Sequence, residues 1–484
     1  MPRPRWIIVT AVAVCALAVC ALAVFLLSRA HATTAPSVTP LPAPATPRAV
    51  GVAGCSGRAC HGGSSAAGAP PPSLAAATFW FENDRHVQAF AALSGEPAER
   101  ILAALHPANP PQPATRDDRC LACHTNPTTV YAPGTQTVDN SAAARALRRD
   151  GVSCEACHGN AGPWLSAHTS WGGQTGELPA TYKKHEMTWL NDLTTRADVC
   201  AGCHVGAPAD AALGLPLRDV THRMIAAGHP RLAFELVSYQ KGLPRHWVER
   251  ERTRKAPDNQ RPGRAARAWL AGQAAGAVAS LRLLEDSASR PNWPEFARYD
   301  CYACHHNLDA GNWRRPEAGR RPGQPVGNAW DLSLPLLRQL AAGGPALRAL
   351  ADVREGMHSY DRTAIAAATP RAVQELRKEL NNLRNAVDPT VLLRKALRDM
   401  TADEDLLAHL RWDDAAQLHL ALAAWGDAAA GGPADFAEQH RQLGNVLRFR
   451  PANGQSWNSP RGYAPAAIAP SLKSIGSGLD AGPP

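Results

Sequence analysis

A short pattern of cysteine and histidine, Cys-x-x-Cys-His, occurs four times in this chain of 484 residues. The copies read "CLACH", "CEACH", "CAGCH" and "CYACH", and they occupy residues 120–124, 154–158, 200–204 and 301–305. At the cysteine and histidine frequencies of this chain, chance would give about 0.01 copies. The repetition constrains the fold more than any other feature, because the chain must build sites of the same chemistry at four places.

The spacing of the pattern suits the covalent attachment of haem. Two cysteines with two residues between them lie about one helical turn apart, so both sulfurs can form thioethers to the vinyl groups of one haem. The following histidine then supplies the proximal iron ligand. Zinc knuckles, an iron–sulfur cluster and disulfides in an exported protein are alternatives, but none explains a histidine after every pair. The motifs predict haem c on Cys120, Cys123, Cys154, Cys157, Cys200, Cys203, Cys301 and Cys304, with proximal ligands His124, His158, His204 and His305.

A fifth cysteine pair has a wider spacing, in "CSGRACHGG", where four residues separate Cys55 from Cys60 and His61 follows. A loop that bulges can still reach both vinyl groups, whereas the alternative is a small disulfide loop in an oxidising compartment. We predict a covalent haem here, with His61 as its proximal ligand, and about five haems in total. Their propionates would nearly offset the formal charge of +9, so this charge gives no reason to expect a nucleic-acid partner.

The second axial positions of these haems need further ligands. The chain holds 18 histidines but only 5 methionines, which favours bis-histidine ligation and low reduction potentials. Two candidates lie seven positions apart in "THRMIAAGHPRLAFEL", where Gly228 and Pro230 predict two short helices facing different haems. Another opens the apolar face of a predicted helix in "NDRHVQAFAAL", and a fourth follows the "CEACH" motif. The distal candidates are His222, His229, His86 and His168; the weaker ones, expected at the surface or in hydrogen bonds, are His106, His185, His246 and His306. One haem is left without an assigned sixth ligand, or is five-coordinate.

The N-terminus contains an uncharged stretch from Ile7 to Leu27, preceded by Arg3 and Arg5. As a helix it would extend about 31 Å, enough to cross a bilayer. We expect an uncleaved anchor, although Ala30-His31-Ala32 resembles a signal-peptidase site. In both cases the positive-inside rule places the rest of the chain outside the cytoplasm, on the periplasmic side of the bacterial inner membrane or, after cleavage, free in the periplasm.

Composition and periodicity divide the chain into five parts. Residues 1–32 are the anchor or signal segment, 33–75 a Pro/Ala/Gly-rich tether that carries the first haem motif, 76–310 the multihaem domain, 325–450 a helical domain, and 451–484 an irregular tail. We predict a helix with a small-residue face around 265–285, and another from the spacing of Val373, Leu376, Leu380, Leu383 and Val387. Thr401 and Glu404 predict a capping box. His419 is expected in a helical scaffold, unless it reaches back to a haem. The fold class is mainly α, with little regular sheet.

Four segments resemble the cytochrome c-554 family, whose members are grouped under the cytochrome c-552/4 domain. They read "RCLACHTNP", "RDGVSCEACHGNAGPW", "THRMIAAGHPRLAFEL" and "FARYDCYACHHNL", and the resemblance extends over about residues 76–310. It implies a mainly helical, haem-packed periplasmic electron carrier whose distal ligands are carried over onto His86, His168, His222 and His229. The chain differs from the family in its wide-spaced first motif, in the intervals between motifs and in a long C-terminal extension.

These observations favour an electron-transfer protein over an enzyme. It would pass electrons between a donor, in the membrane or the periplasm, and an acceptor, both redox proteins. One alternative is a haem enzyme that acts on hydroxylamine or nitrite, which would need an open iron position; no Cys-x-x-Cys-Lys motif is present. Another is a structural or sensory haem module that binds a partner through residues 325–450.

Overall fold

The structure is a computed structural model that describes residues 49–63, 72–108, 112–171, 178–247, 263–299, 343–385, 389–408, 410–428, 436–447 and 464–480. All of these belong to one compact unit, Pro47–Pro484. The expected N-terminal span 7–27, the motif at 301–305 and His306 lie outside the described residues. In the described ranges, no helix is both long and apolar enough to cross a bilayer.

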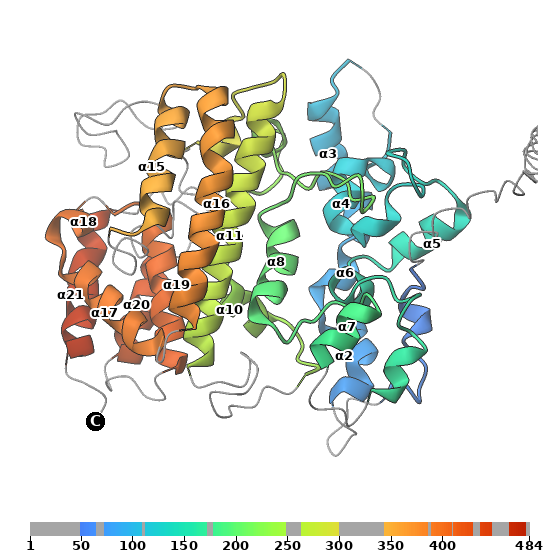
Figure 1. Cartoon of the computed structure of the whole chain (residues 1–484), viewed down its shortest axis with the longest axis horizontal. Coiled ribbons are helices and arrows are strands. Elements are labelled where there is room, and N and C mark those ends of the chain that lie inside the picture. Colours follow the sequence, from blue (N-terminus) through green and yellow to red (C-terminus); the bar gives the residue numbers. More distant parts are fainter. Residues whose placement is uncertain are drawn as a thin grey trace, which may run out of the picture. The chain divides into compact units, whose positions relative to one another are not determined.

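The described part of the chain is built from helices, as predicted (Figure 1). Its β-structure consists of isolated bridges, among them the one between Ala207 and Arg218. The helices of the part that carries the cysteine motifs are short: α2 (Ala76–Asn83), α3 (Glu96–Leu105), α4 (Asp118–His124), α5 (Ala142–Arg149), α6 (Cys154–His158), α7 (Leu178–Lys184), α8 (Leu193–His204), α9 (His222–Ala226) and α10 (Leu236–Gly242). The remainder consists mostly of longer helices: α11 (Arg264–Ser289), α15 (Pro345–His358), α16 (Arg362–Arg384), α17 (Pro389–Ala402), α18 (Glu404–Ala408), α19 (Trp412–Ala428), α20 (Phe436–Leu447) and α21 (Pro465–Asp480).

Helix α11 joins these two sets of helices, because it packs against α8 and α10 as well as against α16, α17 and α19. It has 26 residues, most of them buried, and it confirms the helix predicted around 265–285. Its small residues admit a close neighbour, since a Cβ atom added at Gly272 would lie 2.6 Å from Cβ of Leu236 on α10. The packing of α11 against α8 holds in place the helix that carries the "CAGCH" motif, because Leu193, Ala197 and Ala201 of α8 belong to the same hydrophobic core as α11.

The C-terminal helices form a bundle with a continuous apolar core. Helix α16 confirms the predicted helix as far as Arg384 and buries Leu376, whereas Val387 lies outside the described residues. The capping box does not form. Thr401 lies inside α17, where its hydroxyl donates to the carbonyl of Leu397 (2.9 Å). Helix α18 is capped instead by Asp403, which accepts a hydrogen bond from the N–H of Leu406 (3.0 Å). An aspartate one position before the helix thus replaces the predicted Thr–Glu pair.

One expectation about this bundle is wrong. The predicted irregular tail contains α21, whose apolar residues recur every three or four positions and are buried against α17 and α20: Ile468, Leu472, Ile475 and Leu479. The expected place of His419 in the helical scaffold is confirmed, since it lies on α19. Its ring stacks on that of His440, with centroids 3.9 Å apart and planes 8° from parallel. That spacing is too short for a metal ion between the rings, since metal–nitrogen bonds of about 2 Å on both sides require about 6 Å.

The first described part of the predicted tether, residues 49–63, is fixed to the third cysteine motif. The buried Glu155 carboxylate of α6 accepts hydrogen bonds from the N–H groups of Val50 (3.0 Å) and Gly51 (2.8 Å). The N–H of Val52 donates to Asp150 (2.9 Å). The loop that carries Cys55, Cys60 and His61 is therefore held beside α6 and is not a free linker.

Candidate functional site

A cavity of about 2090 Å³ lies among the short helices. Its lining includes both cysteines and the histidine of four motifs: Cys55, Cys60 and His61; Cys120, Cys123 and His124; Cys154, Cys157 and His158; and Cys200, Cys203 and His204. A pocket for one drug-sized ligand has about 300–1,000 Å³. The cavity therefore has room for more than one large group, and four motifs point into it.

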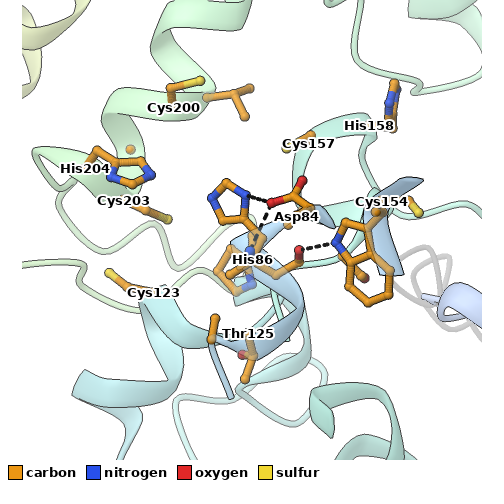
Figure 2. A pocket seen from close by; sticks show the side chains of 18 of the residues that line it. Asp84, His86, Cys123, Thr125, Cys154, Cys157, His158, Cys200, Cys203 and His204 are labelled. Atoms are coloured by element: carbon orange, nitrogen blue, oxygen red, sulfur yellow. Dashed lines mark hydrogen bonds and ion pairs between the residues drawn. The ribbon is translucent and has the colours of Figure 1, made fainter. Parts of the chain in front are cut away.

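The three Cys-x-x-Cys-His motifs in the described residues have the same local structure. Each occupies the last turn of a helix, and α4, α6 and α8 all end at the motif histidine. Asp117 and Asp192 begin α4 and α8 by accepting hydrogen bonds from backbone N–H groups near the start of each helix (3.0 and 2.8 Å). This geometry agrees with two cysteines one turn apart. Figure 2 shows the α8 group Cys200, Cys203 and His204 on one side of Asp84 and His86, and the α6 group Cys154, Cys157 and His158 on the other.

The wide-spaced motif forms a compact turn instead of a helix. The N–H of Cys60 donates to the carbonyl of Gly57 (2.8 Å), and the N–H of His61 donates to the carbonyl of Cys55 (3.2 Å). Gly62 permits this turn, because a Cβ atom there would lie 2.1 Å from the carbonyl oxygen of Ser56. The turn brings Cys60 and His61 to the same cavity as the other motifs, although four residues separate the cysteines.

Three pairs of imidazole rings face each other across the cavity. The ring centroids are 6.1 Å apart for His61 and His168, 6.0 Å for His86 and His204, and 6.3 Å for His158 and His246. With metal–nitrogen bonds of about 2.0–2.1 Å and about 1 Å more from nitrogen to ring centre, two imidazoles on opposite sides of one metal ion have centroids about 6 Å apart. Each pair therefore joins one motif histidine to a second histidine at the spacing of two axial ligands.

The distal candidates from the sequence fall into two groups. His86, His168 and His229 line the cavity. His222 is not among the lining residues: its backbone N–H donates to Glu295 (2.7 Å), and its ring meets Phe296 edge-on, with centroids 5.9 Å apart.

The segment that holds His222 and His229 differs from the prediction in one respect. Gly228, with φ of 114°, does end the helix that begins at His222. However, His229 lies in the extended segment that precedes α10 and not on a second helix. The end of α9 near Gly228 still separates the two histidines, as expected.

His246 is the site residue that the sequence underrated. It is expected at the surface or in a hydrogen bond, and its Nδ1 does pair with the carbonyl of Pro244 (3.4 Å), but its ring also faces His158 inside the cavity. Of the two other weak candidates in the described residues, His106 takes part in a hydrogen bond, as expected, which it accepts from Arg119 (2.8 Å). His185 is half-buried, and its ring lies beside that of Trp171 (5.3 Å between centroids).

The remaining motif histidine of the cavity, His124, has His229 as its neighbour. Burial, and to a smaller extent the nearby His229, lowers the pKa of His124. Both residues line the cavity, so His229 is the candidate second ligand for the group attached at Cys120 and Cys123.

Hydrogen bonds orient several of these rings through Nδ1. Backbone carbonyls accept from His124 (Ala89, 2.8 Å), His168 (Leu165, 2.6 Å) and His229 (Pro230, 2.8 Å), and the Asp84 carboxylate pairs with Nδ1 of His86 (2.9 Å). Because a carbonyl can only accept, Nδ1 carries the proton and Nε2 carries the lone pair that binds a metal. Burial also lowers the pKa of His158 and His204 to about 4, which keeps both rings neutral, as ligation requires.

Neighbouring motifs touch through their sulfurs. A hydrogen bond with Cys154 lowers the pKa of the Cys55 thiol, and one between Cys123 and Cys203 raises the pKa of Cys123. Burial raises the pKa of Cys157 to about 12, and the charges of Cys200 and Cys203 add to this effect. The four sites therefore follow one another in space in the order His61, His158, His204 and His124.

The donor set of this cavity is that of the class of proteins that bind c-type haems: paired cysteines, a histidine after each pair, and second histidines opposite. Residues 58–159 match the model of the family described as cytochrome c554 and c-prime. The match includes Cys60 and His61 and the motifs at 120–124 and 154–158, and it confirms the resemblance for this part of the chain. A c-type cytochrome family implies covalently bound haem. No curated protein and no solved structure gives a significant match.

Proposed function

We propose that this protein is a multihaem c-type cytochrome that transfers electrons in the periplasm through about five covalent haems, most of them with two histidine ligands. The observation that carries the proposal is the set of three histidine pairs, 6.0–6.3 Å apart, in one cavity lined by four cysteine motifs. The fifth haem of this proposal belongs to the motif at 301–305.

The protein's own residues have distinct tasks in this function. When bound, haem iron supplies reversible one-electron chemistry. The cysteines fix each haem to the last turn of a helix or, at Cys55 and Cys60, to a tight turn. The histidine pairs hold the iron in the same surroundings in both oxidation states, and hydrogen bonds at Nδ1 keep the rings from rotating. Contact between successive sites then allows electrons to pass from one haem to the next.

The histidine pairs favour transfer over catalysis. A haem enzyme that acts on hydroxylamine or nitrite needs an open iron position and acid–base groups near it. At His61, His158 and His204, a second imidazole lies at the spacing of a second axial ligand and would close that position. These three sites therefore support electron transfer more than catalysis.

The N-terminal sequence supports a location for this protein, and the electron path implies two partners. The uncharged stretch 7–27 after Arg3 and Arg5 supports an anchor in the inner membrane, with the haem sites on the periplasmic side. A donor and an acceptor, both redox proteins, would then exchange electrons with the haems at the two ends of the row.

A redox titration of the holoprotein tests this function. The protein is produced in a host that matures c-type cytochromes, and its optical spectrum is recorded as the potential is lowered. We expect several reversible steps at low potential, with low-spin spectra throughout. Absence of reversible steps, or a mainly high-spin spectrum, would contradict the proposal.

A further inference from the structure

Arg218 lies at the junction of two cysteine motifs. Its backbone is fixed behind the end of α8, because Arg218 and Ala207 exchange two backbone hydrogen bonds (2.8 and 2.9 Å). Gly206, with φ of 122°, allows this close return of the chain, since a Cβ atom there would lie 2.3 Å from the carbonyl of Arg218. The side chain then lies over the "CAGCH" helix, where Nη1 is 3.2 Å from the position of a Cβ atom on Gly202. The glycine within this motif thus makes room for a guanidinium group.

The charge of Arg218 acts on both motifs. Its guanidinium lies within hydrogen-bond reach of the sulfur of Cys203, and this sulfur in turn contacts that of Cys123 in the neighbouring motif. Its side chain also lines the shared cavity. A fixed positive charge at this place therefore lies close to the attachment points of two haems.

Two other arginines of the cavity, Arg119 and Arg196, already have partners, whereas Arg218 has a buried donor without one. Arg119 pairs with Asp117 and His106, and Arg196 donates to Gln240 (3.1 Å) and to the carbonyl of Leu190 (2.8 Å). In Arg218, Nε is buried and has no hydrogen-bond partner among the described residues. A buried N–H of this kind is costly unless a ligand satisfies it, and the haem propionates are the anions that the proposed function brings into the cavity.

We propose that Arg218 sets the reduction potentials of the two haems attached at Cys120–His124 and Cys200–His204, by holding a positive charge between them. This inference rests on the proposed function. Reduction removes one positive charge from the iron, so a fixed cation in a poorly solvated site favours the reduced form and raises the potential. Arg218 is a positioning residue in this account, since it acts on the iron through its charge.

The test compares the redox titration of Arg218→Gln with that of Arg149→Gln, which removes an equal charge from an exposed position on α5. We expect two of the steps to move to lower potential in Arg218→Gln, with the other steps unchanged, and no such movement in Arg149→Gln. Arg218→Lys, which keeps the charge, should restore both steps. His86→Met should raise one of the same two steps, because methionine ligation raises the potential of the haem at His204.

Unchanged steps in Arg218→Gln, or equal shifts in all steps, would overturn the proposal. The mass of each variant reports its haem content, so loss of the proposed function itself, with no haem attached in any variant, is distinguished from failure of this inference. If the glutamine variant takes up no haem while the lysine variant loads with wild-type potentials, the charge is needed for haem uptake, and this result would also overturn the proposal. Failure of both variants to fold would show a purely structural role and would overturn it.

Discussion

The imidazole of His246 lies opposite that of His158, although nothing in its sequence surroundings indicates an iron ligand. It lies two residues after Pro244 in a loop that follows α10, outside any helical pattern. Only the fold brings it into the cavity. The motif histidines, by contrast, could be predicted because chemistry ties each of them to two cysteines at a fixed spacing. Distal ligands carry no such local constraint, so the sequence alone could rank them only by context.

Replacement of His246 tests this assignment. In His246→Ala one iron loses its second imidazole, so we expect one haem to change from low-spin to high-spin while the haem content stays the same. His185→Ala is the matched control, because His185 does not belong to the cavity lining. The optical spectrum and electron paramagnetic resonance of both variants check the result; a spin change in neither variant would remove His246 from the ligand set.

The imidazole planes of His61, in the wide-spaced motif, and of His168 make an angle that spectroscopy can detect. The rings of His61 and His168 are 18° from parallel, whereas those of His86 and His204 are at 72° and those of His158 and His246 at 61°. Nearly parallel planes split the iron d orbitals strongly and give a rhombic low-spin resonance, while crossed planes give a signal with one very large g value. We expect Cys55→Ser/Cys60→Ser to lose one haem by mass together with the rhombic signal. A disulfide loop at this place would leave both unchanged.

At the scale of elements, the sequence predicted helices best where an apolar period is long. The helices α11 and α16 follow their patterns, and α21 shows a clear period that a tail rich in proline, glycine and serine obscured. The region around His86 was harder, since it forms two 3-10 helices, Arg85–Gln88 and Ala91–Ser94, in place of the expected amphipathic helix. Asp84 explains the difference, because its carboxylate accepts a hydrogen bond from the backbone N–H of His86 (2.9 Å) and also pairs with Nδ1 of the same residue. The turn that results holds the ring of His86 in one orientation.

The stacked pair of His419 on α19 and His440 on α20 predicts a pH dependence of the bundle. Burial, and then the neighbouring His440, lowers the pKa of His419 to about 4, whereas an unfolded histidine has a pKa of about 6.5. Between these values the unfolded chain binds the proton and the folded chain does not. Stability is therefore complete above about pH 6.5 and declines, by about 1–3 kcal/mol, as the pH falls toward 4.

Urea denaturation followed by circular dichroism at pH 7 and pH 4.5 measures this effect. In His419→Phe the stacked ring remains but the titration is removed, so we expect a smaller loss of stability at pH 4.5 than in the wild type. His185→Phe, outside the bundle, should behave like the wild type. Equal pH dependence in all three proteins would show that His419 does not titrate on unfolding.

At the scale of the whole molecule, the cavity and the helical bundle meet at α8 and α11. The core of the bundle packs against α8 through Leu193, Ala197 and Ala201, while Cys200, Cys203 and His204 of the same helix line the cavity. The sequence could predict the division into a motif-rich part and a helical part, since the chain contains no cysteine after about residue 325 and shows helical periods there. It could not predict that one hydrophobic core joins them, because that contact depends on side chains far apart in the chain.

The central claim of this account is that each cysteine pair is bonded to a haem. The intact mass of the mature, denatured protein, made in a host that matures c-type cytochromes, tests it most directly. We expect the mass of the polypeptide plus five haems, with the colour retained on the chain after denaturation, and the same measurement reports whether residues 1–32 are kept. A mass equal to the bare polypeptide, with all colour released into the solvent, would contradict the account.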